Sequence, residues 1–283
     1  MKKQKILLPR YEQQKIREGF SFVIGCDEVG RGCLAGPVVA AAVALPLQVL
    51  SASRRTKFEV LKWGRIADSK VLSQRERERL DAIIRQQGIG WGIGIVSEKI
   101  VDKINIHNAS LLAMKKAVGD LLQRLQKKNQ AVGDSENFFV SFGATISSEC
   151  IRVEKSIFDT GLSNRSLHSP SDVMKISQRE TFGFSRDGAL SCFLVLDGKF
   201  IIPSFTVQQE AIIDGDAKIL SIAAASIVAK VYRDKLMKKF SVKYPDYNFA
   251  RHKGYATLEH RTAIKKFGLT PLHRKSFCKK YIK

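Results

Sequence analysis

The sequence has few cysteines and no pattern that would pair them. The five cysteines of this 283-residue chain are odd in number, widely spaced and without a CxxC pair. A disulfide framework or a cysteine-based zinc site is therefore not expected. Reduced, mostly buried thiols are typical of a cytoplasmic protein, so a cytoplasmic location is predicted. The cysteines are Cys26, Cys33, Cys150, Cys192 and Cys278.

Long apolar runs are also missing. No stretch approaches the roughly 20 apolar residues that a membrane-spanning helix needs, so no membrane association is expected. The basic start, residues 1–15, contains an apolar run that is too short for a signal peptide. Hydrophobic residues nevertheless make up 44% of the chain. That share is enough for a sizeable core and argues against wholesale disorder.

Acidic residues are outnumbered. The chain has 48 Lys and Arg residues against 27 Asp and Glu, a net charge of +21. More than half of the excess lies in residues 230–283, where 16 basic residues accompany 3 acidic ones. A local basic patch of this kind is typical of a protein that binds nucleic-acid phosphates. The alternative is a solvated basic surface that only aids solubility.

The sequence alternates between strand-like and helix-like segments. Short apolar runs predict strands at 21–26, 36–45, 88–97 and 192–196. Apolar periodicity and capping signals predict helices at 74–87, 105–126, 221–243 and 257–268. Glycines alternate through the strand predicted at 88–97, which indicates close backbone packing or a bulge. The alternation of strands and helices predicts an α/β fold.

Two segments stand apart from this alternation. Residues 1–19 are polar and basic and are expected to form an N-terminal arm or a short helix. Residues 127–190 are rich in Ser, Asn and Gly, and their 8 basic and 8 acidic residues leave them neutral. We interpret residues 20–283 as one large domain that is interrupted by an insertion at 127–190.

Carboxylates follow two of the predicted strands. Asp27 and Glu28 come directly after the first strand, and Asp197, followed by a glycine, ends the last one. Adjacent carboxylates at a strand end are costly to bury unless a cation accompanies them. Their hard oxygen atoms suit Mg²⁺ or Mn²⁺. Taken alone the Asp–Glu pair is a weak signal, because most such pairs are exposed loop residues.

Further carboxylates precede the helix predicted at 221–243. Asp214 and Asp216 lie just before it, and the alternative role for Asp216 is to cap the helix N-terminus. Three or four carboxylates at strand and helix ends, with few histidines, are typical of a two-metal phosphodiesterase. The five histidines show no metal-ligand spacing. They are interpreted as surface or core residues, or as phosphate contacts near the basic C-terminal region.

A glycine-rich turn, Gly30-Arg31-Gly32, follows the first carboxylate pair. Glycine permits a positive φ and lets the backbone approach a ligand closely. The backbone N–H groups can then meet a phosphate or sugar oxygen, and Arg31 adds a forked donor. The alternative is a tight turn with a purely structural role.

Six blocks of the sequence, in order, resemble the ribonuclease HII family, the type 2 ribonucleases H. The opening block is DEVGRGCLAGPVVAAAVAL, residues 27–45, and the others follow at 67–73, 104–118, 195–200, 213–234 and 252–277. The resemblance covers most of the chain outside 1–19 and 127–190. It implies a ribonuclease H-like mixed sheet flanked by helices, with a helical, basic C-terminal region.

The resemblance also implies roles for the carboxylates. Asp27, Glu28 and Asp197 are implied to bind Mg²⁺ or Mn²⁺, with Asp216 as the fourth active-site carboxylate. Asp216 is preferred to Asp214 because it precedes the AK-x-x-SIAAAS block.

Substrate contacts are implied in the same way. Gly30, Arg31 and Gly32 are implied to read the ribonucleotide at the cleaved junction, partly through its 2′-hydroxyl. Tyr255 is implied to pack on the next sugar, and its alternative role is that of an ordinary half-buried tyrosine. Cys33 departs from the family pattern, which commonly has proline at this position.

The family implies an endonuclease for RNA–DNA hybrids. It is expected to cut the RNA strand, also 5′ to single ribonucleotides in duplex DNA, by a two-metal mechanism that leaves 5′-phosphate and 3′-hydroxyl ends. We expect a monomer whose partners are RNA–DNA hybrids and ribonucleotide-containing duplex DNA. Two alternatives stay open: a transposase- or resolvase-like nuclease for DNA, and a nucleic-acid-binding module without catalysis. The related ribonuclease HIII would carry an extra N-terminal platform domain, which we do not see.

Overall fold

A computed structural model of the chain describes residues 7–45, 66, 69–130 and 191–282. Most of the insertion predicted at 127–190 lies outside the described residues, as do Cys150 and His168. Within the described part, no helix is both long and apolar enough to cross a membrane.

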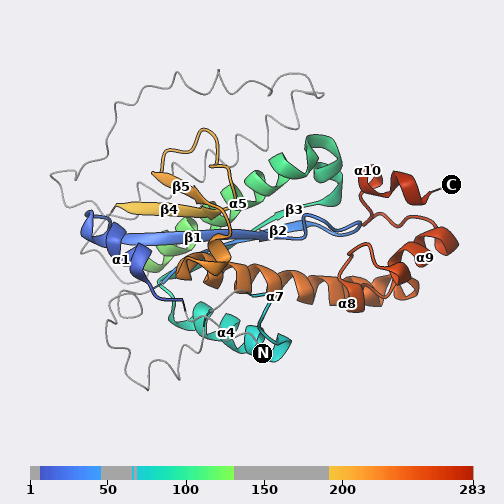
Figure 1. Cartoon of the computed structure of the whole chain (residues 1–283), viewed down its shortest axis with the longest axis horizontal. Coiled ribbons are helices and arrows are strands. Elements are labelled where there is room, and N and C mark those ends of the chain that lie inside the picture. Colours follow the sequence, from blue (N-terminus) through green and yellow to red (C-terminus); the bar gives the residue numbers. More distant parts are fainter. Residues whose placement is uncertain (1–6, 46–65, 67–68, 131–190, 283) are drawn as a thin grey trace.

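A five-stranded mixed sheet forms the centre of the molecule, in the order β3-β2-β1-β4-β5 (Figure 1). Antiparallel pairs join β1 to β2 and β2 to β3, whereas β1 pairs with β4, and β4 with β5, in parallel. The predicted α/β class and mixed sheet are confirmed. The strands are β1 (Phe22–Val29), β2 (Val38–Ala44), β3 (Gly90–Val96), β4 (Cys192–Asp197) and β5 (Gln209–Ile212).

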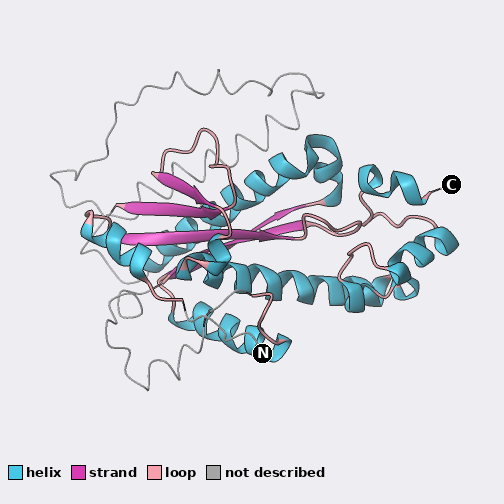
Figure 2. Cartoon of the chain, in the orientation of Figure 1, coloured by secondary structure: helices cyan, strands magenta, loops and turns pink. Residues whose placement is uncertain are grey.

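Helices cover both faces of the sheet, which Figure 2 shows in magenta between them. Successive residues of a strand point to opposite faces. On β2, Ala40 and Ala42 accordingly pack with α5 (Glu98–Gln130), whereas Ala41 and Val43 pack with α7 (Leu220–Lys243). Because every residue of β2 is buried, the strand is a continuous apolar run without polar alternation.

Glycines in β3 let α5 pack very close to the sheet. A Cβ atom added at Gly92 would lie 2.1 Å from the carbonyl oxygen of Ala117, and one at Gly94 would lie 1.9 Å from that of Ala113. No larger residue fits at either position without a shift of the backbone. The close packing predicted from the glycine alternation is therefore confirmed.

The predicted capping box at the start of α4 (Gln74–Gln87) is present. The Ser73 hydroxyl accepts a hydrogen bond from the backbone N–H of Glu76, and the Glu76 carboxylate accepts one from the N–H of Ser73. Helix α4 packs against α7 and against the same face of the sheet, where Arg85 lies over the ring of Trp91 on β3; Figure 1 labels α4 below α7.

The segment predicted as an arm contains α1 (Arg10–Arg17), which packs against β1. Glu12 of this helix is fully buried, and its carboxylate accepts a hydrogen bond of 2.8 Å from the backbone N–H of Ser221, in the first turn of α7. A carboxylate at this position stabilises a helix N-terminus because it meets an N–H group that has no partner within the helix.

Short helices follow α7 and form the C-terminal region at one end of the sheet (Figure 1). Their core contains Met237, Tyr247, Phe249 and Ile264, together with Leu34 from the loop between β1 and β2. The C-terminal region therefore packs on that loop. Its elements are η3 (Pro245–Tyr247), α8 (Phe249–His252), α9 (Leu258–Phe267), α10 (Lys275–Cys278) and η4 (Lys279–Tyr281).

Two elements extend well beyond the sequence predictions. Strand β1 continues to Val29, so Asp27 and Glu28 lie within it rather than after it. Helix α5 runs from Glu98 to Gln130 and is broken at Asn105, whose φ of 66° is non-helical. The side-chain oxygen of Asn105 accepts a hydrogen bond from the N–H of Asn108, so the expected helix start at 105 marks the beginning of the second segment.

Candidate active site

Four carboxylates from three elements meet at the carboxyl ends of β1 and β4. Asp27 and Glu28 lie on β1, Asp197 ends β4, and Asp216 lies in η2 (Gly215–Ala217), just before α7. Asp27 is 6% exposed and Asp216 is 4% exposed. The two strands are parallel neighbours, which brings their carboxyl ends to the same edge of the sheet. The preferred Asp216 is buried, whereas Asp214 is exposed.

Asp27 and Glu28 point to opposite faces of the sheet because they are neighbours on one strand. Asp27 faces α7, where Ser226 donates a hydrogen bond to it, and its Oδ1 also accepts one from the N–H of Glu28 at 2.7 Å. Glu28 forms an ion pair of 2.9 Å with Arg31 through Oε1. Its other oxygen, Oε2, is buried and has no hydrogen-bond partner.

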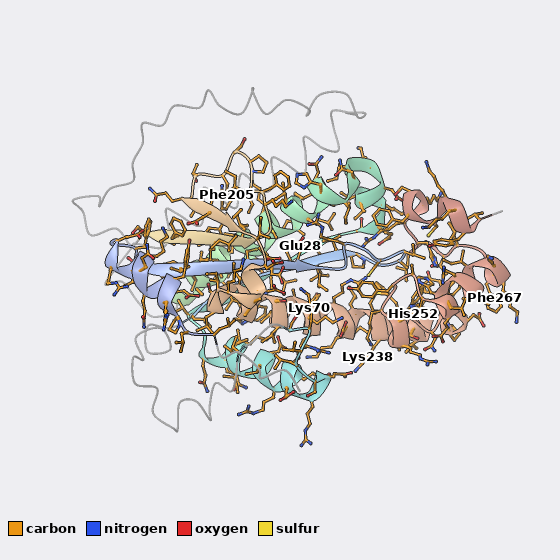
Figure 3. All side chains as sticks on the ribbon, in the orientation of Figure 1. Glu28, Lys70, Phe205, Lys238, His252 and Phe267 are labelled. Carbon is orange, nitrogen blue, oxygen red and sulfur yellow. The ribbon has the colours of Figure 1, made fainter. Side chains whose placement is uncertain are left out.

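Asp197 and Asp216 are held by the turn that precedes α7. The N–H of Gly215 donates a hydrogen bond of 2.7 Å to Oδ1 of Asp197. A Cβ atom at Gly215 would lie 2.6 Å from Cδ1 of Ile222 and 3.2 Å from Oδ1 of Asp197, so a larger residue there would displace the Ile222 side chain and crowd the carboxylate. Asp216 forms an ion pair of 2.8 Å with Lys70. Figure 3 shows Lys70 and Glu28 near the middle of the molecule.

The carboxylates interact as a group. Burial raises the pKa of Asp27 well above its ordinary value, and the charges of Glu28, Asp197 and Asp216 raise it further. Burial also raises the pKa of Glu28 and that of Asp197. Arg31 opposes the shift at Glu28, and the N–H of Gly215 opposes it at Asp197. Like charges buried together in this way are typical of a functional site.

The carboxylates do not surround a common point. Within the described residues, no three His, Cys, Asp or Glu side chains form a ready-made metal site. The physical reason is that Glu28 turns toward Arg31 and Asp216 toward Lys70. The oxygen chemistry nevertheless suits a hard divalent cation, and the unpartnered Oε2 of Glu28 offers it a ligand atom.

Two fully buried arginines hold the loop that contains Gly30, Arg31 and Gly32. Arg274 donates to the carbonyl oxygens of Arg31 (2.8 Å) and Gly36 (2.8 and 3.1 Å). Gly30 has a φ of 96°, and a Cβ atom there would lie 2.4 Å from Nε of Arg233. Arg233, the second arginine, donates to the carbonyl oxygens of Ala35, Pro37 and Lys253.

Tyr255 lies beside the same loop. Its backbone forms a β-bridge with Cys33, and the Cys33 thiol donates to the carbonyl oxygen of Lys253 at 3.7 Å. The Tyr255 side chain is 39% exposed. The structure thus brings Gly30, Arg31 and Tyr255 to one end of β1, next to the carboxylates.

Three histidines belong to the core of the C-terminal region. His252, His260 and His273 are all buried, and Nε2 of His260 lies 3.0 Å from Nε2 of His273. The core interpretation is correct for these three, and the alternative of phosphate contacts is wrong, because their rings pack on Phe249. Figure 3 labels His252 in this region.

Sequence reasoning missed several residues that shape the site. Lys70 lies in the ADSKVLS block, where its charge is the only signal of a role. Ser226, which also lies 2.9 Å from Ser69, is one of the small residues on α7. Arg233 and Arg274 lie within the basic stretch 230–283, and no local pattern distinguishes a buried arginine from an exposed one.

Comparisons with known proteins agree with this geometry. The family model for ribonuclease HII matches residues 24–137 and 195–280. A ribonuclease HII from Acetivibrio thermocellus is 38% identical over 272 residues, which cover 96% of this chain and 75% of that protein. A ribonuclease HII from Alkaliphilus metalliredigens is 36% identical over 272 residues, covering 96% of this chain and 97% of that protein.

A solved structure supports the fold. The ribonuclease H2 from Pyrococcus horikoshii superimposes with a TM-score of 0.50 at 17% identity, covering 92% of this chain and 96% of that one. The chain therefore belongs to the ribonuclease HII family and is a ribonuclease H, an endonuclease for the RNA of RNA–DNA hybrids.

Proposed function

We propose that the chain cuts the RNA strand of RNA–DNA hybrids, and also cuts 5′ to single ribonucleotides embedded in duplex DNA, leaving 5′-phosphate and 3′-hydroxyl ends. The buried cluster of Asp27, Glu28, Asp197 and Asp216 beside the glycine-rich loop carries this proposal. Negative charge concentrated next to a phosphate-binding loop opposes plain nucleic-acid binding and favours catalysis with cations.

Asp27, Glu28 and Asp197 are the proposed ligands of the divalent metal ions, with Asp216 as the fourth carboxylate. Two bound Mg²⁺ or Mn²⁺ ions would supply an activated water molecule and stabilise the leaving 3′-oxygen. Metal binding also accounts for the electrostatics, because cations offset the mutual repulsion that raises the pKa of Asp27. With metal ions bound, Glu28 would exchange Arg31 for a cation, which would leave the Arg31 side chain available to a substrate phosphate, and Lys70 would stay paired with Asp216.

The loop and Tyr255 are the proposed readers of the ribonucleotide. Arg274 binds the carbonyl oxygens of Arg31 and Gly36, so the loop is held before substrate arrives. Its backbone N–H groups can then meet the 2′-hydroxyl at the cleaved junction. The half-exposed ring of Tyr255 offers a flat surface for the next sugar.

The basic C-terminal region is the proposed contact for the duplex backbone. Lys275, Lys279 and Lys280 are exposed on the last short helices. Contacts to phosphates hold the duplex without reading its sequence. We propose that the chain acts as a monomer, with residues 20–283 as the catalytic domain and 127–190 as an insertion in it.

A cleavage assay on three labelled duplexes tests the function. One carries a single ribonucleotide in DNA, one is an RNA–DNA hybrid and one is all DNA, each with Mg²⁺, Mn²⁺ or EDTA. We expect a metal-dependent nick on the 5′ side of the single ribonucleotide, cleavage of the hybrid, and an intact DNA duplex. Cutting of the all-DNA duplex would point instead to a general nuclease.

A further inference from the structure

Large apolar side chains are exposed directly beside Asp197. Phe200 is 56% exposed, Ile201 is 49% exposed and Ile213 is 52% exposed. We call these three residues the apolar rim. The first two follow Asp197 on the loop between β4 and β5, and Ile213 follows the end of β5, so all three lie at the carboxyl ends of these parallel strands.

The loop that carries the apolar rim is well anchored. The N–H of Gly198 donates to the carbonyl oxygen of Ile212 at 3.0 Å. The side-chain amide of Gln209 binds both backbone groups of Ile202, at 2.8 and 2.9 Å. Ile202 and Phe205 are buried in the core beneath α5, and Figure 3 labels Phe205. These hydrogen bonds fix the backbone of the loop between β4 and β5, so Phe200 and Ile201 are exposed on an ordered loop.

His107 supports the ring of Phe200. The two rings meet edge to face, with centroids 4.5 Å apart and planes at 69°. His107 lies two residues after the break in α5 at Asn105. Burial, followed by the charge of Arg31, lowers the pKa of His107. The edge-to-face contact with His107 links Phe200 to helix α5.

We propose that the apolar rim, with Phe200 at its centre and His107 as its support, packs against a sugar of the nucleic-acid substrate next to the cleaved bond. This inference rests on the proposed function. In a duplex the bases are stacked on one another, so the C–H faces of the sugars are the apolar surface that lies between the phosphates.

The charges around the rim favour this occupant. Lys199, which directly precedes Phe200, is exposed, and Lys218 is exposed and donates to the carbonyl oxygen of Ile213 at 2.6 Å, so positive charge that suits phosphates accompanies the apolar rim. Asp197 is only three residues from Phe200 in sequence. A duplex with its cleaved bond at the carboxylates therefore passes the rim.

Duplex binding by a Phe200→Ala variant tests the proposal. Both proteins carry Asp197→Asn so that the substrate stays intact, and fluorescence anisotropy of the single-ribonucleotide duplex gives the Kd as a function of salt. We expect the Kd to rise about tenfold, the loss for removing one aromatic side chain that becomes buried on binding. The slope of log K against log salt stays unchanged, because the protein still meets the same phosphates. Phe200→Tyr, which keeps the ring, retains the affinity.

Leu8→Ala is the matched control, since Leu8 is 48% exposed and precedes α1 at the other end of β1. Its Kd stays at the parent value. Equal affinities for the Phe200→Ala and parent proteins would overturn the proposal, as would a flatter salt slope or an equal loss with Leu8→Ala. The proposed function fails separately, if protein with native Asp197 and Phe200 cuts no ribonucleotide-containing duplex.

Discussion

Two groups of buried charge in this molecule are built in opposite ways. Arg233 and Arg274 are fully buried, and each donates three hydrogen bonds to backbone carbonyl oxygens. The carboxylates are buried together, so that each raises the free energy of its neighbours' ionised forms, and one oxygen of Glu28 has no partner.

The difference separates structure from function. A buried charge whose hydrogen-bonding groups are satisfied stabilises one arrangement of the chain, here the loop at the end of β1. Buried like charges with incomplete partners destabilise the folded protein, and such an arrangement persists where a ligand uses it. Asp197→Asn and Arg274→Met each change one of these two groups.

The largest effect is expected for Asp197→Asn. Asparagine keeps an oxygen that can accept from Gly215, but it removes the charge. We expect single-turnover cleavage to fall by about a thousandfold, at the upper end for loss of one electrostatic group in an active site. Removal of a repelling charge also leaves the stability equal or higher at pH 7.

Asp81→Asn is the matched control for that change. Asp81 is also buried, but it pairs with Arg85 at 2.7 Å and lies outside the site. Its loss should lower the free energy of unfolding by about 1.5–3 kcal/mol without slowing cleavage. Near-normal cleavage by Asp197→Asn would refute the role of that carboxylate.

Arg274→Met tests the satisfied charge. Methionine fills similar space but leaves the carbonyl oxygens of Arg31 and Gly36 without these donors. We expect urea denaturation to show a loss of about 3 kcal/mol, the penalty for leaving buried acceptors unpaired. The control is Arg251→Met. The Arg251 side chain is 78% exposed and forms a long ion pair of 3.8 Å with Glu259, so this change should alter the free energy of unfolding by under about 1 kcal/mol. Equal stabilities of the two variants would contradict a structural role for Arg274.

The buried histidines predict acid sensitivity of the C-terminal region. Burial lowers the pKa of His260 and of His273 to about 4. A depressed pKa contributes stability above the unfolded value of about 6.5 that is lost as pH falls toward 4. Between pH 7 and 5, the free energy of unfolding should therefore fall on the order of 4 kcal/mol more in the native protein than in a His260→Gln/His273→Gln variant, about 2 kcal/mol for each ring. Parallel pH profiles in urea denaturation would show that these rings do not carry the effect.

The exposed lysines give the smallest expected effect. Replacing Lys275, Lys279 and Lys280 by glutamine should weaken duplex binding and lower the salt slope by about 0.9 for each phosphate that the variant no longer binds. Arg10→Gln/Arg17→Gln, on α1 at the other end of the sheet, serves as the control for net charge alone. If the slope of log K against log salt stayed unchanged in the lysine variant, these three lysines would not contact the phosphates of the duplex.

Much of the fold was predictable because its signals are local. The capping box of Ser73 and Glu76 marks the start of α4, and the alternating glycines of β3 indicated close backbone packing or a bulge, of which the structure shows the close packing. Strand β5 escaped prediction because Gln209–Ile212 is short, partly exposed and not uniformly apolar. Its pairing with β4, rather than its own residues, makes it a strand.

The sequence by itself determined the α/β class, the elements with strong local patterns and, through the blocks around Asp27, Asp197 and Asp216, the candidate carboxylates. Only the tertiary structure decided that Arg274 holds the loop at Gly36, that Lys70 faces Asp216, and that Phe200 lies exposed against His107. Periodicity and capping act between near neighbours, whereas these contacts join residues that are 93 to 238 positions apart. No local pattern records such a partner, because burial and orientation arise only when the sheet and its helices pack together.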